Sequence, residues 1–113
     1  MECDQEVLGA VSDVVIDAYA VDSMVTRTRQ AAGPSGLDPV RVAMTVAYAV
    51  EAHARSIERA RKALCACAEG AALEQLLARI APLTQFRPYA PTTLRETVVQ
   101  AIEAATGYPA AVA

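Results

Sequence analysis

Alanine accounts for 25 of the 113 residues of this chain. Alanine has the highest helix propensity, since its side chain loses no rotamer entropy in a helix and hides no polar group. Aromatic residues, which favour strands, are few: one phenylalanine, four tyrosines and no tryptophan. The length is typical of one domain. We therefore expect a single all-α domain over residues 1–113.

Apolar residues recur with helical spacing in four segments, which predicts helices at about 4–32, 38–69, 71–81 and 93–106. In the first segment the apolar residues alternate between steps of four and three, which predicts one inward stripe. Its members are Val7, Val11, Val14, Ala18, Val21 and Val25.

Residues at the expected helix ends have the chemistry of helix caps. Gly33 suits a left-handed position after the first helix. Asp38 can accept amide hydrogens of the second helix, with Pro39 at its first position. Thr93 and Glu96 have the spacing of a capping box for the last helix.

Four amphipathic helices with short connections predict an antiparallel four-helix bundle with two long and two shorter helices. Alanines on the inner faces allow close helix approach, but they bury less apolar area than leucines do. We therefore expect a partner surface to complete the stability of the module.

Charge and hydropathy exclude several classes of protein. The net charge of −3 and the pI near 5 argue against binding nucleic acid, which requires a basic excess. The longest apolar stretch, at residues 42–50, is too short to span a membrane. The acidic N-terminus is unlike a secretory signal. We expect a soluble cytoplasmic protein.

Neither a metal site nor a nucleophilic catalytic group is predicted. His53 is the only histidine and has no carboxylate or second histidine one turn away, so it is interpreted as structural. Cys65 and Cys67 form an isolated C-x-C pair, and we interpret them as reduced, buried small hydrophobes.

Two carboxylates lie one turn apart on the first helix, at Asp13 and Asp17. Paired carboxylates can divide acid and base roles when an apolar pocket separates their pKa values, but no such pocket is evident in the sequence. We interpret them either as part of a solvated face or as polar residues that pair this helix with arginine.

A basic stripe formed by Arg55, Arg59 and Lys62 follows one face of the second helix. One interpretation is a solvated face balanced by Glu51 and Glu58. The other is a docking surface for an acidic protein patch or for anionic lipid headgroups at a membrane surface.

Several short motifs together resemble, in order, the C-terminal domain of very-long-chain-type acyl-CoA dehydrogenases. The resemblance covers nearly the whole chain. The matching motifs are Ile16-Asp17-Ala18-Tyr19-Ala20-Val21-Asp22-Ser23 with Arg27-Thr28-Arg29, then Met44-Thr45-Val46-Ala47-Tyr48-Ala49-Val50-Glu51-Ala52, then Leu94-Arg95-Glu96 and Gly107-Tyr108-Pro109.

The resemblance implies an accessory role. In that family a separate body binds FAD and carries the catalytic glutamate that oxidises a fatty acyl-CoA thioester, and none of that machinery maps onto this chain. We therefore expect no catalytic residue and no cofactor bound by this chain. The expected role is docking or oligomer stabilisation, with the acyl-CoA dehydrogenase body as partner.

Two other hypotheses remain open. The alanine-rich amphipathic helices are also compatible with a free-standing interaction module that forms a homo-oligomer. An acyl-CoA carrier that holds its ligand inside the bundle is the third hypothesis, with the arginine stripe meeting the phosphates.

Overall fold

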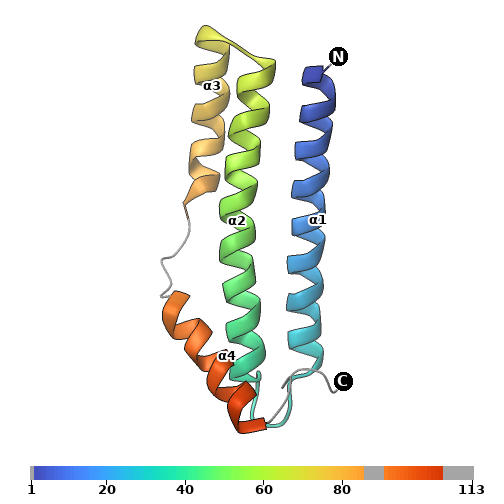
Figure 1. Cartoon of the computed structure of the whole chain (residues 1–113), viewed down its shortest axis with the longest axis vertical. Coiled ribbons are helices and arrows are strands. Elements are labelled where there is room, and N and C mark those ends of the chain that lie inside the picture. Colours follow the sequence, from blue (N-terminus) through green and yellow to red (C-terminus); the bar gives the residue numbers. More distant parts are fainter. Residues whose placement is uncertain (1, 86–90, 106–113) are drawn as a thin grey trace. The chain divides into compact units, whose positions relative to one another are not determined.

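The computed structural model describes residues 2–85 and 91–105, and over these residues it is helical with no strand (Figure 1). The predicted all-α class is confirmed. The elements are α1 (Glu2–Gln30), α2 (Pro39–Cys67), α3 (Gly70–Ile80), the 3-10 turn η1 (Ala81–Thr84) and α4 (Pro91–Ala105). Every predicted helix is present, with its ends within two residues of the expected positions.

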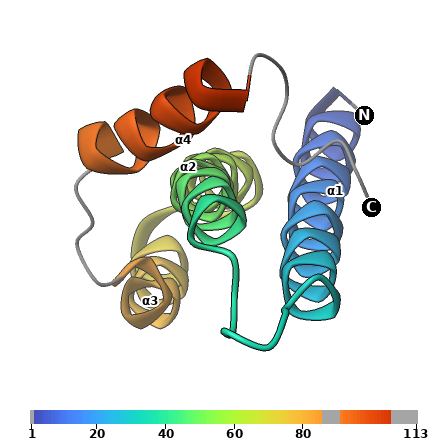
Figure 2. The same ribbon diagram turned by 90° about the horizontal axis from the view of Figure 1, so that it is seen from below.

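The chain divides into two compact units, and both long helices run through both units. The first unit contains Met1–Tyr19 and Glu51–Arg87, and the second contains Ala20–Val50 and Pro88–Ala113. In the first unit, the start of α1 lies beside the end of α2, and α3 lies on another side of α2 (Figures 1 and 2). Side-chain contacts described below show that α1 and α2 are antiparallel in this unit.

The loop between the long helices is closed differently from the prediction. Gly33 and Gly36 exchange two backbone hydrogen bonds, each with an N···O distance of 3.0 Å. The glycine with positive φ is Gly36, at 100°, and not Gly33. The prediction of a left-handed Gly33 was therefore wrong, because the reciprocal bonds place the left-handed residue at the end of the turn.

Substituting alanine for Gly36 is expected to destabilise the fold by about 1–2 kcal/mol, because a Cβ is strained at this φ. No atom lies within 4 Å of the added Cβ, so backbone strain alone causes the loss. Gly33→Ala is the matched control and should be nearly neutral. Urea unfolding of the two variants measures the difference, and equal midpoints would contradict it.

Two other predicted helix starts had different outcomes. The Asp38 cap is confirmed, because the Val40 amide donates to Asp38 Oδ1 at 3.0 Å. The capping box of Thr93 and Glu96 was wrong, since α4 begins at Pro91 and Thr93 already lies within its first turn. Proline fixes φ near the helical value, which favours it at a helix start.

Few apolar side chains are buried in the described part of the chain. The buried apolar residues there are Ala43 and Ala52, both on α2. On α1, Val11 and Ala18 of the predicted inward stripe are exposed, whereas Asp17 and Thr28 are buried. That stripe was therefore partly wrong, because polar residues of α1 with partners on α2 take the inward positions.

Helix α3 follows its predicted pattern of apolar residues more closely than α1 does. The leucines of α3 and Ile80 are partly buried, as expected from their spacing.

None of the helices is long and apolar enough, over the described residues, to cross a membrane. Two segments lie outside the described residues. They are the expected connector that contains Phe86 and Tyr89, and the motif Gly107-Tyr108-Pro109.

Candidate functional site

A cluster of ion pairs joins α1 to α2 in the first unit. Asp17, which is buried, accepts hydrogen bonds from Arg55 through Nη2 at 3.2 Å and Nε at 3.4 Å. It also accepts one from Arg59 Nη1 at 2.8 Å. One turn earlier, Asp13 lies 3.6 Å from Arg59 Nε. This order of contacts fixes an antiparallel register between the two helices.

The arginines stabilise the charged form of the buried carboxylate. The pKa of Asp17 is below its usual range, chiefly because Arg55 donates hydrogen bonds to it. Burial acts in the opposite direction, and the hydrogen bonds and positive charges of the two arginines together outweigh it. The cluster therefore joins two acidic side chains of α1 to two basic side chains of α2.

The predicted basic stripe is divided by these contacts. Arg55 and Arg59 are directed to the α1 carboxylates, and their side chains are 40% and 32% exposed. Lys62 is 76% exposed and lies 3.6 Å from Glu58, as expected for an i,i+4 pair. Lys62 is therefore the residue of the stripe whose charged group is most accessible. The docking role of the stripe stays a prediction.

An open groove lies between α1 and α2 beside the ion pairs. Small residues line it together with charged ones from both helices: Glu6, Gly9, Ala10, Asp13, Arg59, Lys62, Ala63 and Ala66. Acidic residues come from α1 and basic residues from α2, so the groove has no single sign of charge. It offers no convergent set of groups for a small ligand.

A second polar contact joins the long helices in the second unit. The hydroxyls of Thr28 and Thr45, both buried, lie 2.9 Å apart. Each also lies 2.8 Å from a carbonyl oxygen of its own helix, at Met24 and Arg41 respectively. A hydroxyl has one hydrogen, so one threonine donates across the helices while the other donates to its own carbonyl.

His53 has a structural contact in the first unit. Its Nε2 lies 2.8 Å from the carbonyl oxygen of Leu83 in η1. A carbonyl only accepts, so Nε2 carries the hydrogen and ties the end of η1 to α2. Within the described part of the chain, no group of three histidine, cysteine or acidic residues is placed to hold a metal.

The interpretation of Cys65 and Cys67 as buried hydrophobes was wrong, because the side chains of both free cysteines are exposed. They lie in the last turn of α2. The prediction rested on the small, apolar character of cysteine, but a side chain is buried only where another element covers it.

An outward face of α1 carries the largest apolar surface that the sequence interpretation missed. Its residues are each 53–74% exposed and all belong to the first unit: Leu8, Val11, Val15, Ile16 and Tyr19. Steps of three, four and one place them on one side of the helix. This spacing was available in the sequence, but the predicted valine stripe, which shares Val11 with this face, was interpreted as the inward side. We call these five residues the α1 outer face.

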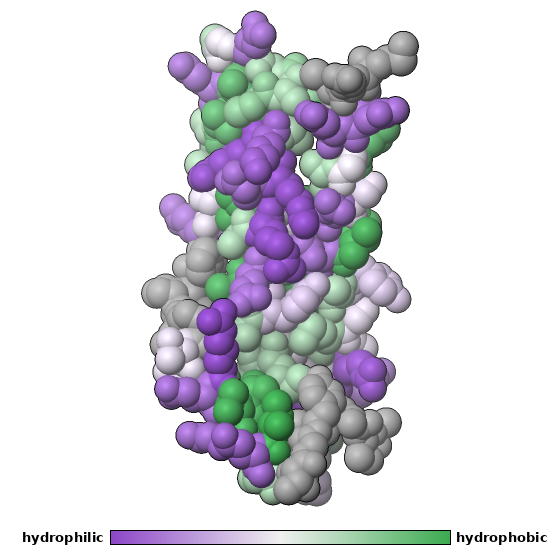
Figure 3. Space-filling model, viewed as in Figure 1, coloured by the Kyte–Doolittle hydropathy of each residue, from purple (hydrophilic) through white to green (hydrophobic). Residues whose placement is uncertain are grey.

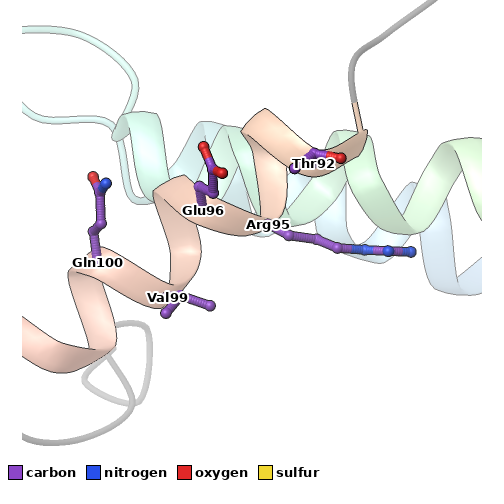
Figure 4. A pocket seen from close by; sticks show the side chains of 5 residues that line it. All are labelled: Thr92, Arg95, Glu96, Val99 and Gln100. Carbon is purple, nitrogen blue, oxygen red and sulfur yellow. The ribbon is translucent and has the colours of Figure 1, made fainter.

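Other hollows do not gather functional groups. One lies along α4 and is lined by Thr92, Arg95, Glu96, Val99 and Gln100. These side chains come from successive turns, and Figure 4 shows Glu96 and Gln100 pointing away from Val99 rather than toward a common centre. A similar hollow on α3 is lined by residues 72–79 of that helix alone. Neither arrangement can hold a reacting group from two sides.

The sequence of this chain is similar to known proteins of one family. Residues 1–81, which contain α1, α2 and α3, match the family described as the C-terminal domain of acyl-CoA dehydrogenase. The chain is also similar to a probable acyl-CoA dehydrogenase of Bacillus subtilis (strain 168), with 32% identity over 87 residues. The similarity covers 75% of this chain and 15% of that relative. No solved structure matches the chain. The chain belongs to the acyl-CoA dehydrogenase C-terminal domain family.

Proposed function

We propose that this chain is the accessory, non-catalytic helical domain of an acyl-CoA dehydrogenase of the very-long-chain type, and that it docks on the flavoenzyme body or stabilises its oligomer. The observation that carries the proposal is the family match over residues 1–81, together with a relative of which the chain spans only 15%. The body would bind FAD and carry the catalytic base, and this chain would supply helical surface.

The packing of the chain supports a role beside a larger protein. The buried apolar residues of the described part are two alanines, each of which removes little apolar area from water. Large apolar residues remain exposed along one side of α1, including Leu8, Val15 and Tyr19. A contiguous apolar face is typical of a surface that another protein covers.

Several finer features belong to the same proposal. The helices would complete an antiparallel four-helix bundle and act as one domain over residues 1–113. The protein would work in the cytoplasm, where its thiols stay reduced. A membrane surface is a weaker candidate partner, since Lys62 is the stripe residue with the most accessible charge.

An affinity-capture experiment tests the proposal. The tagged chain is passed through a lysate of its source organism, and retained proteins are identified by mass spectrometry and by flavin absorbance. We expect an acyl-CoA dehydrogenase at near-stoichiometric amount. Adding that purified flavoprotein should also raise the Tm of the chain, because a ligand of the folded state stabilises it.

A free-standing homo-oligomer is the second candidate, favoured by the apolar α1 outer face. Analytical ultracentrifugation separates the two. Concentration-dependent dimerisation without capture of any acyl-CoA dehydrogenase would contradict the first proposal and support the second. A stable monomer that captures the dehydrogenase would support the first.

A further inference from the structure

The α1 outer face has the shape and composition of a helix that lies in a groove of a partner. Its five residues extend over three turns of α1, from Leu8 to Tyr19, at i, i+3, i+7, i+8 and i+11. Figure 1 shows this part of α1 as the upper half of the helix at the edge of the ribbon. A helix recognised in a groove presents anchors at this spacing. Tyr19, the most exposed of the five at 74%, is a residue type enriched at interface hot spots.

The packing of the first unit does not account for these apolar residues. The side of α1 that meets α2 carries Asp17, whose partners are Arg55 and Arg59. Single exposed apolar residues are common on protein surfaces, but five on one helix face form a continuous patch. In the face shown in Figure 3, hydrophilic surface forms a band over the upper half of the picture.

The charge around the face defines the chemistry of its partner. The first 26 residues contain six acidic residues and no basic one. Asp13 and Asp17 are paired with arginines of α2. Asp4 is exposed and lies one turn before Leu8 on the same side of α1. A surface that fits this one is apolar at its centre and basic at its rim.

Resting on the proposed function, we propose that the α1 outer face docks into an apolar groove with a basic rim on the body of the acyl-CoA dehydrogenase. This assigns Leu8, Val15 and Tyr19 as anchors and Asp4 as the residue that meets the basic rim.

Two observations favour the enzyme body over a second copy of the chain as occupant. The similar Bacillus subtilis protein is mostly outside the matched region, since the match covers 15% of it, so a large body accompanies this segment there. In a pair of outer faces, Asp4 of each copy would meet a face that carries no basic residue, because residues 1–26 contain none. A carboxylate without an opposite charge at an interface opposes such pairing.

The test compares binding of two triple variants to the purified acyl-CoA dehydrogenase from the source organism by isothermal titration calorimetry. The first variant is Leu8→Gln, Val15→Gln, Tyr19→Gln on the α1 outer face. We expect its affinity to fall by about 100-fold or more, because truncation of central interface anchors has effects of this size. Glutamine keeps the helix propensity high, and circular dichroism verifies that helix content and Tm are unchanged.

The matched control carries the same kind of change at exposed apolar residues elsewhere: Leu37→Gln, Leu83→Gln, Val99→Gln. Its affinity should stay within about threefold of the unsubstituted chain. If the control loses binding and the α1 variant does not, the docking face lies elsewhere and the inference is overturned. Equal binding by all three proteins would overturn it as well.

Charge is tested by Asp4→Lys, with Glu74→Lys on α3 as the control of equal charge change. Stopped-flow measurement at low salt should give an association rate about tenfold lower for Asp4→Lys than for Glu74→Lys, and the difference should shrink as salt screens the charges. Equal association rates for the two variants would contradict the assignment of Asp4 to a basic rim on the partner.

The outcomes separate this inference from the proposed function. If the unsubstituted chain binds no acyl-CoA dehydrogenase, the proposed function fails and the inference fails with it. If the chain binds but the α1 variant binds equally well, only the inference fails. If the α1 variant instead abolishes self-association, the occupant is a second copy and the assignment to the enzyme body is wrong.

Discussion

Replacing Asp17 by asparagine is expected to lower the Tm of the chain by about 5 °C or more, because it leaves two arginines without their buried anionic partner. Differential scanning calorimetry at neutral pH measures the change. Asp13→Asn is the matched control on the same helix. Its carboxylate is 54% exposed and meets a single arginine, so its removal should shift the Tm by about 2 °C or less.

The pH dependence of stability should change in the same variant. Because the pKa of Asp17 is lowered in the folded state, its ion pairs stabilise the fold fully above the ordinary carboxyl pKa of about 4. This contribution is lost as the pH falls from there toward the lowered folded pKa. Asp17→Asn should therefore show a weaker loss of Tm below pH of about 4 than the unsubstituted chain. Parallel Tm profiles for the two proteins would contradict this role.

Replacing Ala52 by leucine is expected to reduce the free energy of unfolding by about 1–3 kcal/mol, since a buried site without free space must move its neighbours to accept three more carbon atoms. Ala52 is 2% exposed, the lowest exposure among the buried apolar residues. The larger side chain would force apart elements that the small alanine allows to lie close together. Urea unfolding followed by circular dichroism measures the loss.

The control for this substitution is Ala54→Leu, two residues further along α2 at an exposed position. Both changes add the same atoms to the same helix, so differences in helix propensity cancel. Ala54→Leu should stay within about 0.5 kcal/mol of the unsubstituted chain. Similar losses at both positions would mean that Ala52 is not tightly packed.

Both predictions concern residues whose burial the helical pattern alone does not give. The apolar spacing predicted an inward stripe on α1 that includes Val11 and Ala18, yet these are exposed and Asp17 is buried. A carboxylate is buried only when opposite charges and hydrogen bonds stabilise it. Here those donors come from Arg55 and Arg59, which lie 38 and 42 residues away in the sequence.

The candidate interaction surface was missed for a related reason. The first helix carries valines on more than one side, and periodicity alone does not decide which side meets another helix. The structure shows Leu8, Val15 and Tyr19 on the side that α2 leaves exposed. The sequence interpretation instead emphasised the basic stripe of α2, two members of which make ion pairs with α1 carboxylates.

The helical class and the ends of the helices, to within two residues, could be predicted from the sequence. These features depend on propensity, caps and breakers that act within about one helical turn, such as Asp38 with the Val40 amide. The inward side of α1, the closure of the loop by Gly33 and Gly36, and the set of exposed apolar residues could not be predicted in the same way. Those outcomes depend on groups distant in the sequence, because burial is a property of the pair of surfaces in contact and not of one helix.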